Sequence, residues 1–302
     1  MSKNLKNMII GPSGIGKVHI RESINFGFQN IYLLGKKYKA EREASLIKEY
    51  KNVNFFNLKS IDSVQKIKPD IINLCSPTKN HHTQIKIIKK FCKYLIIEKP
   101  IFWIKNKNIS NLKVARDLLN LKRNRIFVNL PMISLANQIK KKNKFKKIKL
   151  LNFNYFTKGK NKFEDVPIDL LPHALSFLFT LNSNKLNNLE ILEINKKSNS
   201  WQCKIIINDC FCKFFFKQNP KSQKSTLSFK INEDTYLRKN FVKKKFLINK
   251  VLKNKKKLIT IKNPMSDYLN LIFKNLNKNK VLKKNNDITL NSIKIMEKLI
   301  NY

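Results

Sequence analysis

The stretch that decides the fold is Asn7-Met8-Ile9-Ile10, followed by Gly11-Pro12-Ser13-Gly14-Ile15-Gly16-Lys17-Val18-His19. A short apolar run that ends at a glycine is typical of a buried strand, and residues 17–26 read as a helix. A strand that passes through a glycine-rich turn into a helix can present backbone N–H groups to a phosphate. The sequence therefore predicts a phosphate-binding turn directly after the first strand.

Two phosphate-binding patterns compete for this turn. Gly11, Gly16 and Lys17 fit the GxxxxGK pattern, but the next residue is Val18, which has no hydroxyl to hold magnesium. In the dinucleotide pattern GxGxxG, Gly11 and Gly16 take the first and third positions, and Ser13 takes the second. The segments further along the chain favour the dinucleotide pattern, with these residues expected against the cofactor: Gly11, Ser13, Gly14, Ile15 and Gly16.

Strands and helices alternate over the first part of the chain. This alternation predicts an α/β Rossmann domain at 1–130 with a parallel sheet. The expected strands are 7–10, 31–34, 53–56, 70–75, 94–97 and 126–129, and the expected helices are 17–26, 40–50, 60–66, 81–92 and 110–122.

Strand-like runs then follow one another, which predicts an α+β domain at 131–302 with a mostly antiparallel sheet. This second domain is expected to bind the substrate and to support oligomerisation. The expected strands are 148–156, 189–194, 201–207, 211–216, 226–231 and 258–261, with helices at 134–142, from near 172, at 266–276 and at 289–300, and a surface loop at 277–287.

The end of the second strand is where an acidic side chain would bind the ribose of NAD. The sequence there reads Gly35-Lys36-Lys37. Cations at this place suit the 2′-phosphate of NADP, although two surface lysines would look the same in so lysine-rich a chain. We therefore expect NAD or NADP, with a slight preference for NADP through Lys36 and Lys37.

The composition is strongly basic, with a net charge of +44 from 63 basic and 19 acidic residues. Only six basic residues are arginine, and the lysines are spread along the whole chain, so a compositional bias explains the charge without a nucleic-acid partner. No apolar run is long enough for a membrane span, and the start lacks a signal-peptide pattern. The five cysteines form no CxxC pair, and His81-His82 has no suitably spaced partner for a metal. We expect a cytoplasmic protein that binds no membrane, nucleic acid or metal.

Three further segments resemble motifs of a known protein family. They are Cys75-Ser76-Pro77-Thr78-Lys79-Asn80-His81, Glu98-Lys99-Pro100 and Asp169-Leu170-Leu171-Pro172-His173. In this order and with the GxSxxGxxH turn, they resemble the glucose–fructose oxidoreductase / inositol dehydrogenase / MocA (Gfo/Idh/MocA) family. The resemblance implies that Ser76, Pro77 and His81 flank the cofactor, with Glu98 and Lys99 beside the nicotinamide ring and the substrate. It further implies that Asp169 and His173 close the site from the second domain, and it favours a homo-oligomer.

The residue types fit hydride transfer, which needs a group that takes or returns the hydroxyl proton. We expect Lys99 to be catalytic, His173 to be the acid/base, and Asp169 to orient the substrate or Lys99. Asp169 and His173 are four apart, so they share one face if a helix starts near Pro172. His173 could instead be a satisfied core histidine, and Asp169 a helix cap.

The sequence thus predicts an NAD(P)-dependent oxidoreductase acting on a hydroxyl or keto carbon of a sugar, sugar derivative or polyol. A catalytically silent cofactor-binding regulator on the same fold and a charge-driven nucleic-acid binder are the alternatives. Departures from the family pattern are Ser13, the missing acid after the second strand, the missing glycines at 164–168, and Asn129-Leu130-Pro131 without an Arg or Tyr. The last two leave the substrate open.

Overall fold

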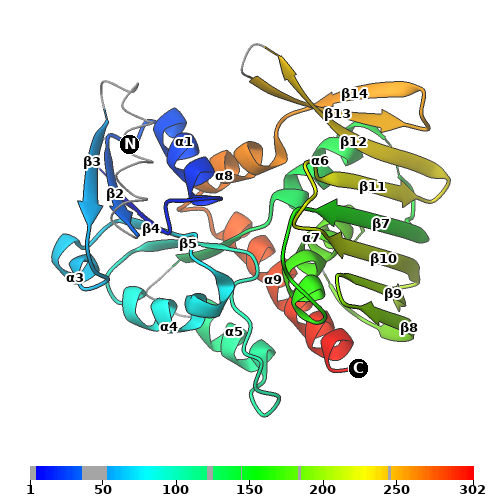
Figure 1. The fold of residues 1–302 in the computed structure, drawn as a ribbon, viewed down its shortest axis with the longest axis horizontal. Helices are drawn as coiled ribbons and strands as arrows, with labels where there is room; N and C mark the ends of the chain where they lie inside the picture. The colour runs from blue at the N-terminus through cyan, green and yellow to red at the C-terminus, as the bar shows by residue number, and fades with distance from the viewer. Residues whose placement is uncertain (1–4, 36–52, 121–124, 144, 183–184, 244–245) are drawn as a thin grey trace. The chain divides into compact units, whose positions relative to one another are not determined.

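The structure is a computed structural model that describes residues 5–35, 53–120, 125–143, 145–182, 185–243 and 246–302. The chain divides into two compact units (Figure 1). Unit 1 comprises Met1–Asn129 and Tyr268–Asn286, and unit 2 comprises Leu130–Asp267 and Asp287–Tyr302. The predicted class, an α/β Rossmann domain followed by an α+β domain, is confirmed.

Unit 1 is built on a parallel sheet in the order β3-β2-β1-β4-β5-β6. The strand order reverses between β1 and β4, and ligands of open α/β sheets bind at the carboxyl ends of the strands at such a reversal. The strands are β1 Lys6–Ile10, β2 Asn30–Leu34, β3 Asn54–Leu58, β4 Ile71–Leu74, β5 Tyr94–Glu98 and β6 Arg125–Asn129. The helices are α1 Gly16–Phe26, α3 Ser63–Ile67, α4 Thr78–Ile88 and α5 Asn111–Leu119. The helix expected at 40–50 lies outside the described residues.

The central strands of this sheet are buried on both faces. Consecutive residues Met8 and Ile9 of β1, and Ile71 and Ile72 of β4, have no exposed surface. Side chains of consecutive strand residues point to opposite faces, so both faces of the sheet are covered. This explains why these strands read as continuous apolar runs in the sequence.

The last two helices, α8 Pro264–Lys274 and α9 Asn279–Ile300, contribute residues to both units. The Phe273 ring lies 5.2 Å from the ring of Phe26 and 5.3 Å from that of Phe28. Residues 268–286 therefore group with unit 1, whereas the sequence placed them in the second domain. The surface loop expected at 277–287 is wrong from residue 279 onward, where α9 has begun. The many lysines and asparagines of α9 obscure its helical pattern in the sequence, although the helix has a buried face that includes Asn285 and Ile288.

Asn285 should be among the residues of α9 that stabilise the fold most. Its amide accepts from Val128 N at 2.9 Å, donates to Val128 O at 2.7 Å, and donates to the Tyr268 hydroxyl at 2.8 Å. Asn285→Ala leaves the two Val128 backbone groups without this partner. We expect a loss of about 3 kcal/mol in the free energy of unfolding, measured by urea titration. The exposed Lys283→Ala on the same helix is the control, and equal losses would contradict this role.

Unit 2 is built on a sheet in the order β14-β13-β12-β11-β7-β10-β9-β8. β7 and β10 are parallel and the other pairs are antiparallel. The strands are β7 Leu150–Thr157, β8 Leu189–Lys197, β9 Ser200–Ile207, β10 Cys210–Gln218, β11 Thr226–Ile231, β12 Asp234–Lys243, β13 Phe246–Lys253 and β14 Lys257–Ile261. No strand was expected over β12 and β13, because frequent lysines and asparagines obscure the period-two pattern there.

Two helices of unit 2 come from the first part of its chain, α6 Pro131–Lys142 and α7 Asp165–Leu181. The expectation that α7 starts near Pro172 is wrong, because Pro172 lies inside the helix. The proline of the first turn is Pro167, where a missing N–H costs no helical hydrogen bond. Asp169 is therefore not the N-cap. From Leu170 to Leu181 the helix is buried on all sides, so its sequence gives no amphipathic signal. None of the described helices combines the length and the apolar character needed to cross a membrane.

Candidate active site

The glycine-rich turn of unit 1 is formed by close backbone approaches. Gly11 N donates to Leu34 O at 2.8 Å, and Gly11 has a φ of +81°. A Cβ on Gly11 would lie 2.8 Å from Ser76 N, and a Cβ on Gly16 would lie 2.1 Å from Gly11 O. The first glycine of the pattern is therefore required by the backbone that follows β4, and the third by the turn itself. Gly14 has a φ of +61°, and a Cβ there would meet nothing within 4 Å.

A hollow of about 510 Å³ opens beside this turn, which suits part of a dinucleotide. The N-terminus of α1 carries no side-chain cap, and its first N–H groups, those of Gly16 and Val18, donate to the carbonyl oxygens of Ser13 at 3.1 Å and Ile15 at 2.9 Å within the turn. Among the described lining residues Lys59 is the one charged side chain, and there is no carboxylate. The hollow therefore fits a phosphate-bearing part of a dinucleotide. It is lined by Ile10, Gly11, Pro12, Ser13, Leu34, Gly35, Lys59, Ser60, Ile61, Ser76, Pro77, Asn80 and Gln84.

Four of the expected cofactor residues line this hollow: Gly11, Ser13, Ser76 and Pro77. Gly14, Ile15 and Gly16 complete the turn and lead into α1, and they do not line the hollow. Lys36 and Lys37 lie outside the described residues. The sequence analysis missed Lys59, Ser60, Asn80 and Gln84. The available signal was position: Lys59 and Ser60 directly follow β3, so they lie at the carboxyl edge of the sheet.

His81 lies on α4 and is 1% exposed. Its Nε2 lies 2.7 Å from Ser76 O, and its Nδ1 lies 3.2 Å and 3.1 Å from the carbonyl oxygens of Pro100 and Ile101. Burial lowers the pKa of His81 and outweighs the effect of these backbone contacts. Rather than lining the hollow, His81 ties the segment after β4 to the segment after β5.

Glu98, at the end of β5, is also directed into the protein interior. Its Oε1 lies 2.7 Å from Nε2 of His19 and accepts from Asn129 Nδ2 at 2.6 Å. Burial alone would raise the pKa of Glu98, but His19 and Asn129 outweigh it and lower the pKa. Burial also lowers the pKa of His19, yet Cys75 and Glu98 raise it well above its usual value. Burial raises the pKa of the Cys75 thiol and outweighs the opposite effect of His19.

Lys99 follows Glu98 directly and is half-buried at the carboxyl edge of the sheet. The buried strand β5 and the buried Glu98 side chain fix the position of the Lys99 backbone. The next residue, Pro100, is buried and follows a cis peptide bond. No cluster of three or more His, Cys, Asp or Glu side chains among the described residues could hold a metal ion.

In unit 2, Asp169 of α7 is held by two amides. Its Oδ2 accepts from Gln218 Nε2 at 2.6 Å and from Asn161 Nδ2 at 3.3 Å. Gln218 is 2% exposed, and a Cβ on Gly159 would lie 2.2 Å from its Oε1, so the glycine makes room for this amide. Gln218 and Asn161 were not foreseen from the sequence.

His173, one turn further along α7, is 8% exposed. Its ring meets the Tyr155 ring of β7 edge-on, with the centroids 5.3 Å apart. Asp169 and His173 both lie within α7, four residues apart, as the predicted shared face requires. Tyr155 was also missed, because an alternating strand does not reveal which of its residues faces a histidine.

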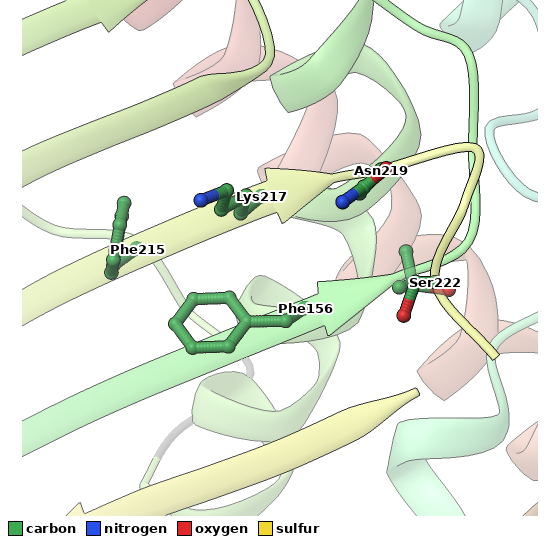
Figure 2. Close-up of a pocket in the computed structure, with 6 residues that line it drawn as sticks. Phe156, Phe215, Lys217, Asn219 and Ser222 are labelled. Atoms are coloured by element: carbon green, nitrogen blue, oxygen red, sulfur yellow. The ribbon is translucent and has the colours of Figure 1, made fainter. Parts of the chain in front are cut away.

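A second hollow, of about 330 Å³, lies on unit 2 at the ends of β7 and β10 (Figure 2). The rings of Phe156 and Phe215 meet edge-on, with their centroids 5.2 Å apart. Lys217 and Asn219 line the hollow further along the chain. Along β10, exposed Lys217 alternates with buried Gln218, so this hollow lies on the opposite face of the sheet from the Gln218–Asp169 contact. It is therefore separate from the residues expected to act on the substrate.

Residues 5–130 match the model of the Gfo/Idh/MocA oxidoreductase family with an NAD-binding Rossmann fold. No curated protein sequence matches the chain. Similar solved structures include UDP-N-acetylglucosamine 3-dehydrogenase GnnA from Acidithiobacillus ferrooxidans, with 12% identity, a TM-score of 0.64, and coverage of 98% of this chain and 99% of that one.

Two further structures share the fold. The WlbA dehydrogenase from Thermus thermophilus in complex with NAD and UDP-GlcNAcA has 12% identity, a TM-score of 0.66, and coverage of 98% and 94%. Biliverdin reductase from Synechocystis sp. PCC 6803 in complex with biliverdin and NADP+ has 9% identity, a TM-score of 0.65, and coverage of 99% of both chains. At these identities the likeness concerns the fold alone.

Proposed function

Because residues 5–130 belong to the Gfo/Idh/MocA oxidoreductase family with an NAD-binding Rossmann fold, we propose that this chain is an NAD(P)-dependent dehydrogenase or reductase. Its proposed substrate is a sugar, sugar derivative or polyol that reacts at a hydroxyl or keto carbon. The observation that carries the proposal is the hollow beside the Gly11 turn, at the strand-order reversal where dinucleotides bind. One of the similar structures is a UDP-N-acetylglucosamine 3-dehydrogenase and another is a dehydrogenase in complex with UDP-GlcNAcA, which supports the sugar class.

The proposed chemistry divides between the cofactor and the chain. The nicotinamide accepts or supplies the hydride when it is bound. The turn from Gly11 to Gly16 would hold the pyrophosphate, while Ser76 and Pro77 would border it. Lys99 would take the hydroxyl proton in oxidation or polarise the carbonyl oxygen in reduction.

His173 and Asp169 receive their roles from the family resemblance. His173 would be the acid/base that exchanges the proton with the substrate when Lys99 only polarises the substrate oxygen, and Asp169 would orient the substrate or Lys99. Asp169 Oδ2 accepts from both Gln218 Nε2 and Asn161 Nδ2, so these two amides fix the direction of the carboxyl group.

The first test is a titration with NADH and NADPH. The chain has two tryptophans, and Trp103 lies shortly after Lys99, so transfer of Trp emission to the nicotinamide reports binding. We expect dissociation constants between about 1 μM and 1 mM, the usual range of enzyme Michaelis constants. AMP should compete, because it is one phosphate-bearing half of the dinucleotide that the hollow is proposed to hold. Absence of transfer with both cofactors at roughly 1 mM would contradict the proposal. A preference for NADPH that Lys36→Ala and Lys37→Ala remove would support NADP.

The oligomeric state and the location also stay proposals. We propose a homo-oligomer formed through the face of the unit 2 sheet that carries Phe156 and Phe215, because aromatic side chains there are half-buried without being covered by α7. Light scattering of the protein and of Phe215→Lys tests this assignment. The cytoplasmic location predicted from the sequence stays a prediction.

A further inference from the structure

A buried chain of hydrogen bonds in unit 1 fixes which atoms of His19 carry protons. The chain starts at the carbonyl oxygen of His19, which can only accept, so the Ser23 hydroxyl donates to it at 2.7 Å. Ser23 Oγ then accepts from Asn7 Nδ2 at 2.7 Å, and Asn7 Oδ1 accepts from Asn73 Nδ2 at 2.7 Å. Asn73 Oδ1 is thereby turned towards His19 Nδ1, 2.9 Å away. His19 Nδ1 must therefore be a donor.

The other ring nitrogen of His19 faces a carboxylate. Nε2 lies 2.7 Å from Glu98 Oε1, which also accepts from Asn129 Nδ2 at 2.6 Å. With Nδ1 already protonated, a proton on Nε2 makes the ring an imidazolium and the contact an ion pair. The amide donor from Asn129 favours the ionised form of Glu98. The Cys75 thiol is another titratable group beside His19, and burial raises its pKa.

The His19–Glu98 pair links α1, the helix that follows the glycine-rich turn, to the segment that carries Lys99. His19 lies on α1, Asn73 on β4, Glu98 at the end of β5 and Asn129 opposite it at the end of β6. His19, Asn73 and Asn129 have no exposed surface, and Glu98 is 7% exposed. A buried carboxylate without a partner is strongly unfavourable. The Glu98 side chain is therefore held in contact with the ring of His19.

We propose that His19 is a positioning residue: its ring, aligned by Asn73, anchors the Glu98 side chain and thereby fixes the backbone from which Lys99 projects. This inference rests on the proposed function, in which Lys99 acts on the substrate. His19 does not line the hollow beside Gly11, and it acts through its contact with Glu98. A displacement of a catalytic group by about 1 Å can lower a rate roughly 100-fold.

The test compares His19→Gln with His82→Gln, a substitution of a partly exposed histidine of α4. Glutamine can still donate to Glu98 but carries no charge. We expect His19→Gln to lower kcat about 10- to 100-fold, as loss of a supporting contact does in metal sites. The Michaelis constants and the cofactor Kd should stay within about threefold, and His82→Gln should behave as the wild type. A wild-type kcat in His19→Gln, or a loss seen only as lower thermal stability and weaker cofactor binding, would overturn the proposal.

Two measurements keep the inference separate from the proposed function. In the unsubstituted protein at pH 8, the ¹⁵N spectrum of the His19 ring should show both nitrogens protonated, and a neutral ring would overturn the proposal. Amide exchange at Glu98 and Lys99 should accelerate in His19→Gln, and unchanged exchange would also overturn it. Absence of any turnover in the wild type would instead remove the proposed function, and these two measurements would still decide whether His19 anchors the segment. If His19→Gln fails to fold, Glu98→Gln should show the same loss of kcat, and wild-type kcat in that variant would overturn the proposal.

Discussion

Replacement of Lys99 by alanine should lower kcat about 1000-fold, within the range attributed to proton transfer by a positioned side chain. Lys99 begins where β5 ends, at the carboxyl edge of the sheet, and it does not line the hollow beside Gly11. The cofactor Kd should therefore change by less than about threefold. Steady-state kinetics and the NADH or NADPH titration measure the two effects on the same preparation.

Two further variants test whether this loss of kcat is specific to the amine of Lys99. Lys90→Ala removes an exposed lysine of unit 1 and should leave both constants unchanged. Lys99→Arg keeps a positive charge but cannot give up its proton near neutral pH. If Lys99 takes the hydroxyl proton, the arginine variant should be as inactive in oxidation as the alanine variant. Near-normal turnover in Lys99→Ala would remove the catalytic assignment, and a wild type that binds cofactor without turning over any sugar or polyol would favour the silent regulator.

Gly16→Ala should abolish cofactor binding and destabilise unit 1. The new Cβ would lie 2.1 Å from the carbonyl oxygen of Gly11, which is backbone and cannot move aside as a flexible side chain would. The turn must therefore open, and overpacking of this kind costs about 1–3 kcal/mol. We expect the Kd for NADH or NADPH to rise at least about 100-fold, equivalent to roughly 2.7 kcal/mol, with a lower midpoint of thermal unfolding.

Gly14→Ala is the matched control in the same turn. Its Cβ would meet nothing within 4 Å, and its cost comes from the φ of +61° alone, which is about 1–2 kcal/mol for an L-residue. We expect binding to weaken by less than about tenfold. Equal effects of the two alanines would mean that the close packing of Gly16 against Gly11 does not form the phosphate-binding turn.

Local patterns determined the elements that begin the chain. The apolar run at 7–10 and the glycines at 11 and 16 act on neighbouring residues, so the strand, turn and helix could be predicted from these residues alone. The same holds for β4 and β5, whose continuous apolar runs required a sheet covered on both faces. The positions of Ser76 and Lys99 at the ends of these strands followed from parallel pairing, because that pairing brings the carboxyl ends to one edge.

The sequence by itself determined the two-domain class, the Rossmann sheet and the turn that suits a dinucleotide, because these follow from period and glycine spacing. Only the tertiary structure decided that His19 meets Glu98, 79 residues away, and that Gln218 holds Asp169, 49 residues away. It also decided where α7 begins and that residues 268–286 group with unit 1. Such contacts depend on how distant segments pack, and a buried polar partner leaves no periodic signal in the chain.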